Sequence, residues 1–204
     1  MSVMSMPATA TALARAGDIP DPRPLRADAD RNRRAILAAA DRLFSERGFD
    51  VPLSEIAAAA GVGRATLYRN FGTRAELAFA LFERNMQLIR DLAASQKGEP
   101  GDLEALLDLK LGCYIRNGGL VEAMQREARA VDFAQERAEV AALLFHAARA
   151  DIAAGRLRPD LDIETFAVLD HALGGAMLSG GPAPDRARRA AVVKSLLLDG
   201  LRAR

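Results

Sequence analysis

Residues Pro52 to Phe71 read PLSEIAAAAGVGRATLYRNF, and this stretch decides the fold expected for the N-terminal part of the chain. Its first half repeats apolar residues at helical spacing, and Gly61 follows where such a helix would end. Its second half places Leu67 and Phe71 four residues apart, as the buried stripe of a second short helix. The stretch therefore predicts a helix-turn-helix. The apolar residues of the first half are Leu53, Ile56, Ala57 and Ala60.

The second of these helices would turn a polar side toward solvent. Most of the side chains on that side are basic, hydroxyl-bearing or amide groups, which can hold phosphates or reach the edges of bases. An ordinary helical hairpin with a polar outer face would show the same pattern, so that alternative stays open at this point. The solvent-facing set is Arg64, Ala65, Thr66, Tyr68, Arg69 and Asn70.

The composition of the whole chain indicates an all-α protein. Half of the 204 residues are hydrophobic and only 5% are aromatic, while Ala and Leu are frequent. Segments that alternate polar with β-branched residues are missing, which disfavours strands. The 28 Lys and Arg are balanced by 27 Asp and Glu, for a formal charge of +1. Any contact with DNA must therefore come from a local patch of charge.

The single cysteine, Cys113, cannot form an internal disulfide, which is typical of a reducing compartment. The first residues lack the basic start and continuous apolar core of a secretory signal. No apolar segment approaches the roughly 20 residues that span a bilayer. We therefore expect a soluble, cytoplasmic protein with no membrane partner.

Residues 1–28 are rich in Ala, Thr, Pro and Arg and are expected to form a flexible arm, whose Arg15, Arg23 and Arg26 either hold phosphate or are merely solvated. A first helix is predicted from about Ala29 to Gly48, capped by Asp28 or Asp30. Arginines cluster in its opening turns, where cations oppose the helix dipole. Contact with phosphate would explain that placement. These arginines are Arg31, Arg33 and Arg34.

The segment from about Ala29 to Leu88 closely resembles the TetR/AcrR-type one-component transcriptional regulators. The resemblance lies in AILAAADRLFSERGF, in Ile56-Ala57 followed three residues later by Gly61-Val62, in Thr66-Leu67-Tyr68 with Phe71, and in RAEL from Arg74. Several short signatures that coincide at fixed spacing form a strong signal. The resemblance implies an N-terminal three-helix DNA-binding domain, residues 29–75, with its helix-turn-helix at 52–71.

The resemblance also implies roles for individual residues. Arg64, Ala65 and Thr66 would face base edges in the major groove, and Tyr68, Asn70 and Arg74 would hold phosphates. Ser54 would either donate to the DNA backbone or cap its own helix, and the two readings stay equal. Three positions depart from the family pattern and put the operator sequence in doubt. They are Pro52, where Thr often caps the helix, Gly63, where a hydroxyl residue is usual, and Asn70, where His is common.

Further helices are predicted at about 74–94, 103–116, 120–130, 133–154, 163–179 and 185–201, which gives about nine in all. Residues 76–204 would form an effector-binding and dimerisation domain. The helix 103–116 is apolar nearly all round and is the expected wall of a pocket for a small, mainly hydrophobic effector. Core packing would explain the pocket residues equally well. They are Met86, Leu107, Cys113, Tyr114, Met124, Phe145 and His146.

The helix 163–179 is apolar on two sides, which suggests that one neighbour belongs to a second copy of the chain. The last helix adds apolar residues to the same surface, and the resemblance likewise implies a homodimer. The residues assigned to this dimer interface are Phe166, Leu169, Leu173, Met177, Val193, Leu197 and Leu201.

No sequence pattern indicates an enzyme, a cofactor or a metal site. The two histidines, His146 and His171, lie on different predicted helices without clustered thiols or carboxylates, and Cys113 is better explained as a small buried residue than as a redox sensor. The expected function is a homodimeric repressor that leaves a double-stranded, pseudo-palindromic operator when it binds its effector. The alternatives are a DNA-binding protein without an effector and a module that only dimerises. The presence of a cavity would separate these alternatives.

Overall fold

The computed structural model describes residues 22–117, 120, 133–177 and 183–203, and within them it contains eight helices and no strand beyond one isolated bridge. The expected all-α class is confirmed. The helices are α1 (Pro22–Arg47), α2 (Leu53–Ala59), α3 (Arg64–Asn70), α4 (Arg74–Ser95), α5 (Asp102–Asn117), α7 (Ala134–Ala153), α8 (Ile163–Met177) and α9 (Ala183–Leu201). The predicted helix at 120–130, which carries Met124, lies outside the described residues apart from Leu120.

Helix α1 begins earlier than the predicted start at Ala29. It includes residues 22–28, which were assigned to the arm. Prolines 22 and 24 are compatible with a first helical turn, because the N–H groups of that turn need no partner within the helix. Asp28 and Asp30 therefore lie inside the helix and do not cap it. Residues 1–21, with Arg15, lie outside the described part of the chain.

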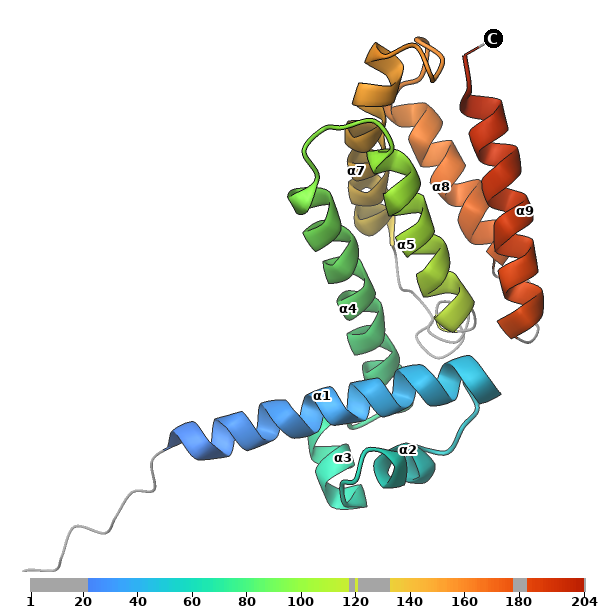
Figure 1. Cartoon of the computed structure of the whole chain (residues 1–204). Coiled ribbons are helices and arrows are strands. Elements are labelled where there is room, and N and C mark those ends of the chain that lie inside the picture. The colour runs from blue at the N-terminus through green and yellow to red at the C-terminus, as the bar shows by residue number, and fades with distance from the viewer. Residues whose placement is uncertain (1–21, 118–119, 121–132, 178–182, 204) are drawn as a thin grey trace, which may run out of the picture.

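Helices α1, α2 and α3 enclose one hydrophobic cluster with the start of α4. Figure 1 shows the long α1 lying across the short pair α2 and α3, with α4 leaving this unit toward the rest of the molecule. The cluster is centred on side chains that are almost completely buried, among them Ile36, Ile56, Leu67, Phe71 and Leu77. We call this part, residues 22 to 75, the head.

The remaining helices form a second hydrophobic cluster, which we call the body. Figure 1 shows α5, α7, α8 and α9 side by side as a bundle, with α4 along one edge. Its centre contains Leu107, Leu144, Phe166 and Leu173, all of which are 1% exposed or less. Because α4 contributes to both clusters, a displacement of α4 against the body would also displace the head.

Polar contacts join the head to the body. The carboxylate of Asp41 on α1 forms an ion pair with Arg84 on α4 at 2.6 Å and accepts a hydrogen bond from the amide of Asn117 on α5 at 2.9 Å. Arg186 on α9 donates to the backbone oxygen of Ser45 on α1 at 3.2 Å. Three helices of the body are thus connected to one side of α1.

Candidate DNA-binding surface and ligand pocket

The turn between α2 and α3 is built as the sequence predicts. Gly61 has a positive φ of 67°, a conformation that suits glycine because it has no Cβ. The N–H of Val62 donates to the carbonyl of Ala57 at 3.0 Å, and the N–H of Gly61 donates to that of Ala58 at 3.1 Å. This pair of hydrogen bonds is the Schellman arrangement that ends a helix sharply. Helix α3 can therefore begin again at Arg64, at a new angle.

Helix α3 is anchored on one side and open on the other. Leu67 and Phe71 are 0% and 1% exposed, as expected for the buried stripe. On the opposite side Arg64, Ala65, Tyr68 and Arg69 are exposed, and Thr66 and Asn70 are half-buried. Tyr68 is 53% exposed, so its ring and hydroxyl are accessible to a partner. The helix thus presents a firmly held surface of mixed hydrogen-bonding groups.

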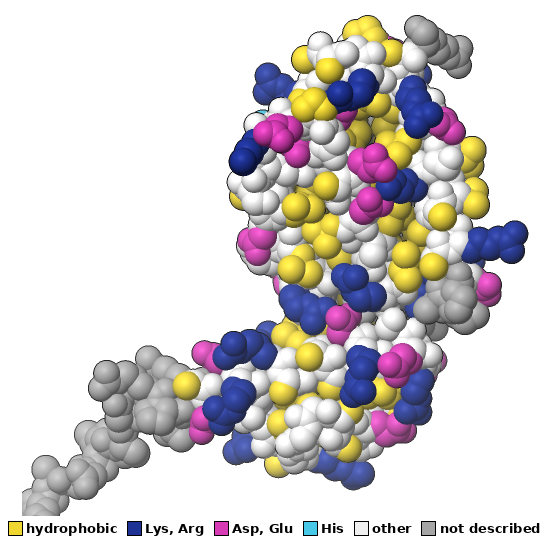
Figure 2. Space-filling view, viewed as in Figure 1, with side chains coloured by type: hydrophobic (Ala, Val, Ile, Leu, Met, Phe, Trp, Pro, Cys, Tyr) yellow, Lys and Arg dark blue, Asp and Glu magenta, His cyan; other side chains and the backbone are white. Residues whose placement is uncertain are grey.

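Two side chains of this surface are already ordered by contacts within α3. The guanidinium of Arg69 donates to the hydroxyl of Thr66 at 3.1 Å, and the amide of Asn70 donates to the backbone oxygen of Thr66 at 2.8 Å. Each bond restricts a long side chain before any partner arrives, which lowers the entropy lost on binding. Basic side chains gather around the head in Figure 2, with acidic ones between them. The head therefore has the local concentration of basic side chains that DNA binding requires in a chain whose net charge is only +1.

Arg74 has a role inside the head that the sequence did not reveal. Its guanidinium donates to the backbone oxygens of Phe49 and of Val51, the latter at 2.8 Å, and lies 5.5 Å from the centre of the Phe49 ring. These bonds satisfy carbonyls in the loop between α1 and α2. The half-buried Arg74 thus fixes α4 to that loop, and its contact with phosphate stays a prediction.

The arginines of α1 do not lie at a helix start, because α1 begins at Pro22. The argument from the helix dipole for phosphate contact therefore no longer applies to them. Arg31 is exposed and paired with Asp28 at 2.7 Å, and Arg34 donates to the backbone oxygen of Asp30 at 3.2 Å. Arg31 and Arg34 remain candidates for contact with phosphate only because they are exposed. Ser54 is half-buried in the first turn of α2, and both readings of its role stay open.

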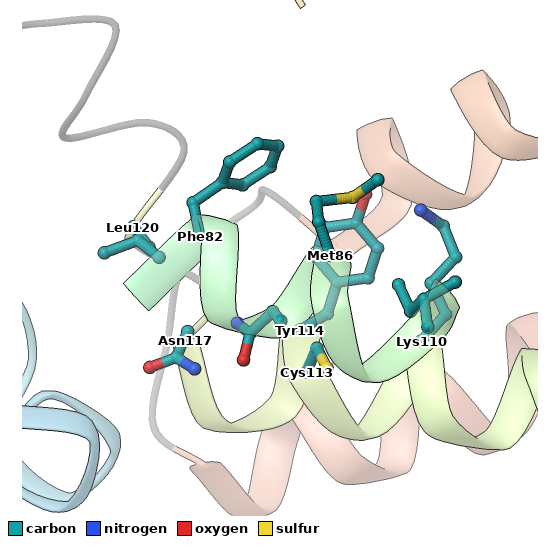
Figure 3. A pocket seen from close by; sticks show the side chains of 9 residues that line it. Phe82, Met86, Lys110, Cys113, Tyr114, Asn117 and Leu120 are labelled. Atoms are coloured by element: carbon teal, nitrogen blue, oxygen red, sulfur yellow. The ribbon is translucent and has the colours of Figure 1, made fainter. Parts of the chain in front are cut away.

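The body contains a cavity of about 360 Å³ between α4, α5, α7 and α8, which is within the range of about 300–1,000 Å³ typical of small-molecule sites. A smaller cavity of about 60 Å³ adjoins it between α4 and α5. Figure 3 shows the residues of the smaller cavity, with Phe82 and Met86 from α4 and Lys110, Cys113, Tyr114 and Asn117 from α5. The larger one is lined by Phe82, Met86, Lys110, Tyr114, Phe133, Glu136, Arg137, Val140, Asp170, His171, Gly174 and Gly175.

The predicted pocket residues divide into four groups. Met86 and Tyr114 line both cavities, and Cys113 lines the smaller one. Leu107 and Phe145 belong to the core, where the ring of Phe145 packs 5.9 Å from that of Phe166. His146 is exposed on α7 and lines neither cavity, so its assignment was wrong: a helical pattern does not say which polar residue faces inward. Met124 lies outside the described residues.

Sequence reasoning missed the polar groups of the larger cavity. Lys110 on α5 and Asp170 on α8 form an ion pair at 2.8 Å and are 7% and 5% exposed. One signal was available in α8, where Asp170 follows the apolar segment Phe166–Leu169, and buried charges need partners. Cys113 is buried, which raises the pKa of its thiol above the ordinary value despite the nearby Arg116 and Lys110. A protonated thiol is a poor nucleophile, in agreement with its interpretation as a small buried residue.

The burial of five residues corrects part of the predicted dimer interface. Phe166, Leu169, Leu173, Met177 and Leu201 are at most 6% exposed within a single chain, and Val193 and Leu197 pack against the same core. Those five fill the space between α7, α8 and α9, so they are not available to a second copy. Val193 and Leu197 are half-buried, and their place in the interface stays a prediction. The pattern of α8 showed two apolar sides, but it could not tell which side the chain itself covers.

A different apolar surface is open on the same two helices. Val168 on α8 is 65% exposed, and Val192 and Leu196 on α9 are 53% and 68% exposed. Ala172, one turn beyond Val168, is exposed as well. We call these four residues the α8–α9 surface.

The described residues contain no cluster of His, Cys, Asp or Glu that could hold a metal ion. Among the same residues, no helix combines the length and apolar character needed to cross a membrane.

Residues 36–81 match the sequence model of a family described as bacterial regulatory proteins, tetR family. An HTH-type transcriptional regulator of Staphylococcus aureus is 26% identical over 106 residues, which cover 50% of this chain and 57% of that protein. The chain thus spans little more than half the length of this curated relative.

Solved structures resemble a larger part of the chain. The TetR transcription regulatory protein from Mycobacterium vanbaalenii is 29% identical with a TM-score of 0.63, covering 88% of this chain and 100% of that chain. A gamma-butyrolactone receptor, described as ArpA-like, is 25% identical with a TM-score of 0.55 over 86% of this chain and 90% of that chain. The similarity therefore includes the body as well as the head.

Proposed function

Because the chain belongs to the TetR family of transcriptional regulators, we propose that it is a cytoplasmic, homodimeric repressor that a small, mainly hydrophobic effector releases from a pseudo-palindromic operator. Residues 29–75, together with the first turns of α1, would bind DNA. Residues 76–204 would bind the effector and the second copy.

The observation that carries this proposal is the outer side of α3. Arg64, Ala65 and Thr66 lie at its N-terminal end, where a recognition helix reaches base edges in the major groove. Arginine donates in pairs to guanine, and the methyl groups of Ala and Thr suit the methyl group of thymine. Tyr68, Arg69 and Asn70 follow, with donors suited to phosphates. Leu67 and Phe71 hold the helix rigid, so these groups keep their relative positions.

The cavity in the body supports an effector. It lies between α4 and three helices of the bundle, and α4 also belongs to the core of the head. A ligand that displaces α4 would therefore change the position of the head. A neighbour of similar fold is described as a gamma-butyrolactone receptor. A gamma-butyrolactone is small enough for a cavity of about 360 Å³. A DNA-binding protein without an effector would have no use for this cavity, which disfavours that alternative.

The α8–α9 surface supports a dimer. Its four apolar residues form two pairs spaced by one helical turn on adjacent helices, so they can meet the same residues of a second copy across a two-fold axis. Two heads related by that axis would enter successive major grooves about 34–36 Å apart. Binding of the effector would change this distance, so that both half-sites are no longer contacted at once.

Selection from random double-stranded DNA, followed by sequencing of the bound duplexes, tests the proposal. We expect an enriched pseudo-palindrome whose half-sites are centred about ten base pairs apart, and one dimer per duplex. Compounds that fill the cavity should then lower the affinity for this duplex, with a coupling of about 1–3 kcal/mol. Failure to enrich any sequence would reject specific DNA recognition. Enrichment of a single half-site bound by one chain would reject the dimer.

A further inference from the structure

The larger cavity has a polar corner where a buried ion pair meets apolar walls. The ammonium of Lys110 and the carboxylate of Asp170 meet there at 2.8 Å, and the ring of Tyr114 lies 5.3 Å from the same ammonium. Phe82, Met86, Phe133 and Val140 supply apolar walls, and Glu136, Arg137 and His171 of the same lining are polar. A ligand that lies between the corner and the apolar walls would therefore place a polar group at the corner and hydrocarbon against Phe82 and Met86.

The two charges of the ion pair at this corner balance each other. Burial opposes the charge of Lys110, but the carboxylate of Asp170 outweighs that effect and raises the pKa of the ammonium above its ordinary value. Burial also raises the pKa of the Tyr114 hydroxyl, which keeps its proton. The corner thus holds one cation, one anion and one neutral hydroxyl. An ammonium has three N–H donors, more than its ion pair with Asp170 can use.

The backbone of α8 fixes where the Tyr114 hydroxyl lies. A Cβ built on Gly174 would lie 3.2 Å from that oxygen, which is tighter than an ordinary contact. Glycine at position 174 therefore leaves room for the hydroxyl. The hydroxyl therefore lies against the backbone of α8 at the wall of the cavity. Glu136 and Arg137, which also line the cavity, bring one charge of each sign to it.

From these contacts, and resting on the proposed function, we propose that the effector is an uncharged amphipathic molecule that places a carbonyl or hydroxyl oxygen against Lys110 and Tyr114 and hydrocarbon against Phe82 and Met86. A carboxylate would have to compete with Asp170 for the ammonium, or lie beside that buried anion without its own counterion. An ammonium ligand would meet Lys110 in the same way. At the corner, either arrangement would take one partner away from a buried ion pair, which is strongly unfavourable.

Three ten-carbon probes separate these classes: γ-decalactone, decanoate and decylamine, each titrated by calorimetry into the DNA-free full chain at pH 7.5. We expect the lactone to bind at least about tenfold more tightly than either charged probe. Tighter or equal binding of decanoate or decylamine would overturn the proposal. Undetectable binding of the lactone up to its solubility limit would overturn it as well.

Substitutions at Lys110 and Asp170 test whether the lactone binds at the corner. Lys110→Met should weaken lactone binding by about tenfold or more. Lys194→Met is the matched control, since Lys194 also joins α5 through an ion pair, with Asp108 at 2.6 Å, but lines neither cavity. Lys110→Met combined with Asp170→Leu removes both charges and guards against misfolding, because apolar replacements of a buried ion pair are commonly tolerated. Unchanged lactone binding in both Lys110 variants would overturn the proposal.

Release of DNA is measured separately with the selected duplex. Lactone binding that depends on Lys110 but leaves the duplex bound would support the ligand class and reject effector release. A compound that releases the duplex equally from the wild type and from the double variant would support effector release and overturn the ligand class. The two proposals can therefore fail independently.

Discussion

The carboxylate of Asp41 is the point where the head meets two helices of the body, and Asp41→Ala tests how strongly it holds them. The substitution removes the partner of Arg84 at 2.6 Å and of the Asn117 amide at 2.9 Å. The side chains of Arg84 and Asp41 are 31% and 20% exposed, so the pair is neither fully exposed nor fully buried. Asn117 is buried at 6% exposure and would be left with an unpaired amide.

The expected loss follows from these exposures. Exposed ion pairs contribute about 0.2–1 kcal/mol, whereas loss of one partner from a buried pair costs about 3–5 kcal/mol. A mostly buried carboxylate with one ion pair and one charge-assisted hydrogen bond lies between these limits, at about 2 kcal/mol. The replacement of Asp41 by Asn should cost less, since an amide oxygen can still accept from Asn117.

Urea denaturation followed by circular dichroism measures this loss in the free energy of unfolding. Asp28→Ala is the matched control, because Asp28 is an aspartate of the same helix whose pair with Arg31 is 55–69% exposed. The control should change stability by no more than about 0.5 kcal/mol. If Asp41→Ala changed it by as little, the carboxylate would not be a structural joint between head and body.

Three further predictions concern α4, α7 and the α8–α9 surface. Thr73→Ala removes the hydroxyl that caps α4 by accepting from the N–H of Glu76 at 3.1 Å, and it should lower the free energy of unfolding by about 1 kcal/mol. An unchanged melting temperature would show that this cap does not stabilise the fold. The hydrogen bond from Arg90 lowers the pKa of Glu139, so this pair should stabilise the fold above the ordinary glutamate pKa and lose that effect as pH falls through the lowered value. Glu139→Gln should therefore be less stable than wild type at pH 7, and the difference should shrink steadily as the pH is lowered below the ordinary glutamate pKa; a difference that did not shrink in acid would contradict this. Val168→Asp with Leu196→Asp should give monomers by analytical ultracentrifugation, and a dimer of unchanged affinity would move the interface elsewhere.

The helices were predictable from the sequence because their limits are local. The segment expected at 74–94 is α4, Arg74–Ser95, and that expected at 103–116 is α5, Asp102–Asn117. Breakers such as Gly98 and Gly101, both with positive φ, set these ends without help from the rest of the chain. The turn at Gly61 was predictable for the same reason. The start of α1 was not, since proline is equally common in arms and in first helical turns.

The contacts between distant segments were not predictable. Nothing local pairs Lys110 with Asp170, and α8 displays two apolar sides whose neighbours only the fold decides. Arg74 is a further example of a contact that the sequence could not predict. A guanidinium after a helix-turn-helix suits a phosphate or a backbone carbonyl equally well, and here it binds the carbonyls of Phe49 and Val51.

The most direct test of the central claim, that the outer side of α3 reads DNA sequence, is the affinity of Arg64→Ala for the selected duplex and for a scrambled one, measured by fluorescence anisotropy. Arg149→Ala, which removes an exposed arginine of α7 in the body, is the control. Arg64→Ala should lose about 1–3 kcal/mol on the selected duplex and little on the scrambled one, while the control changes neither. Equal losses on both duplexes, or no loss on either, would contradict sequence reading by α3.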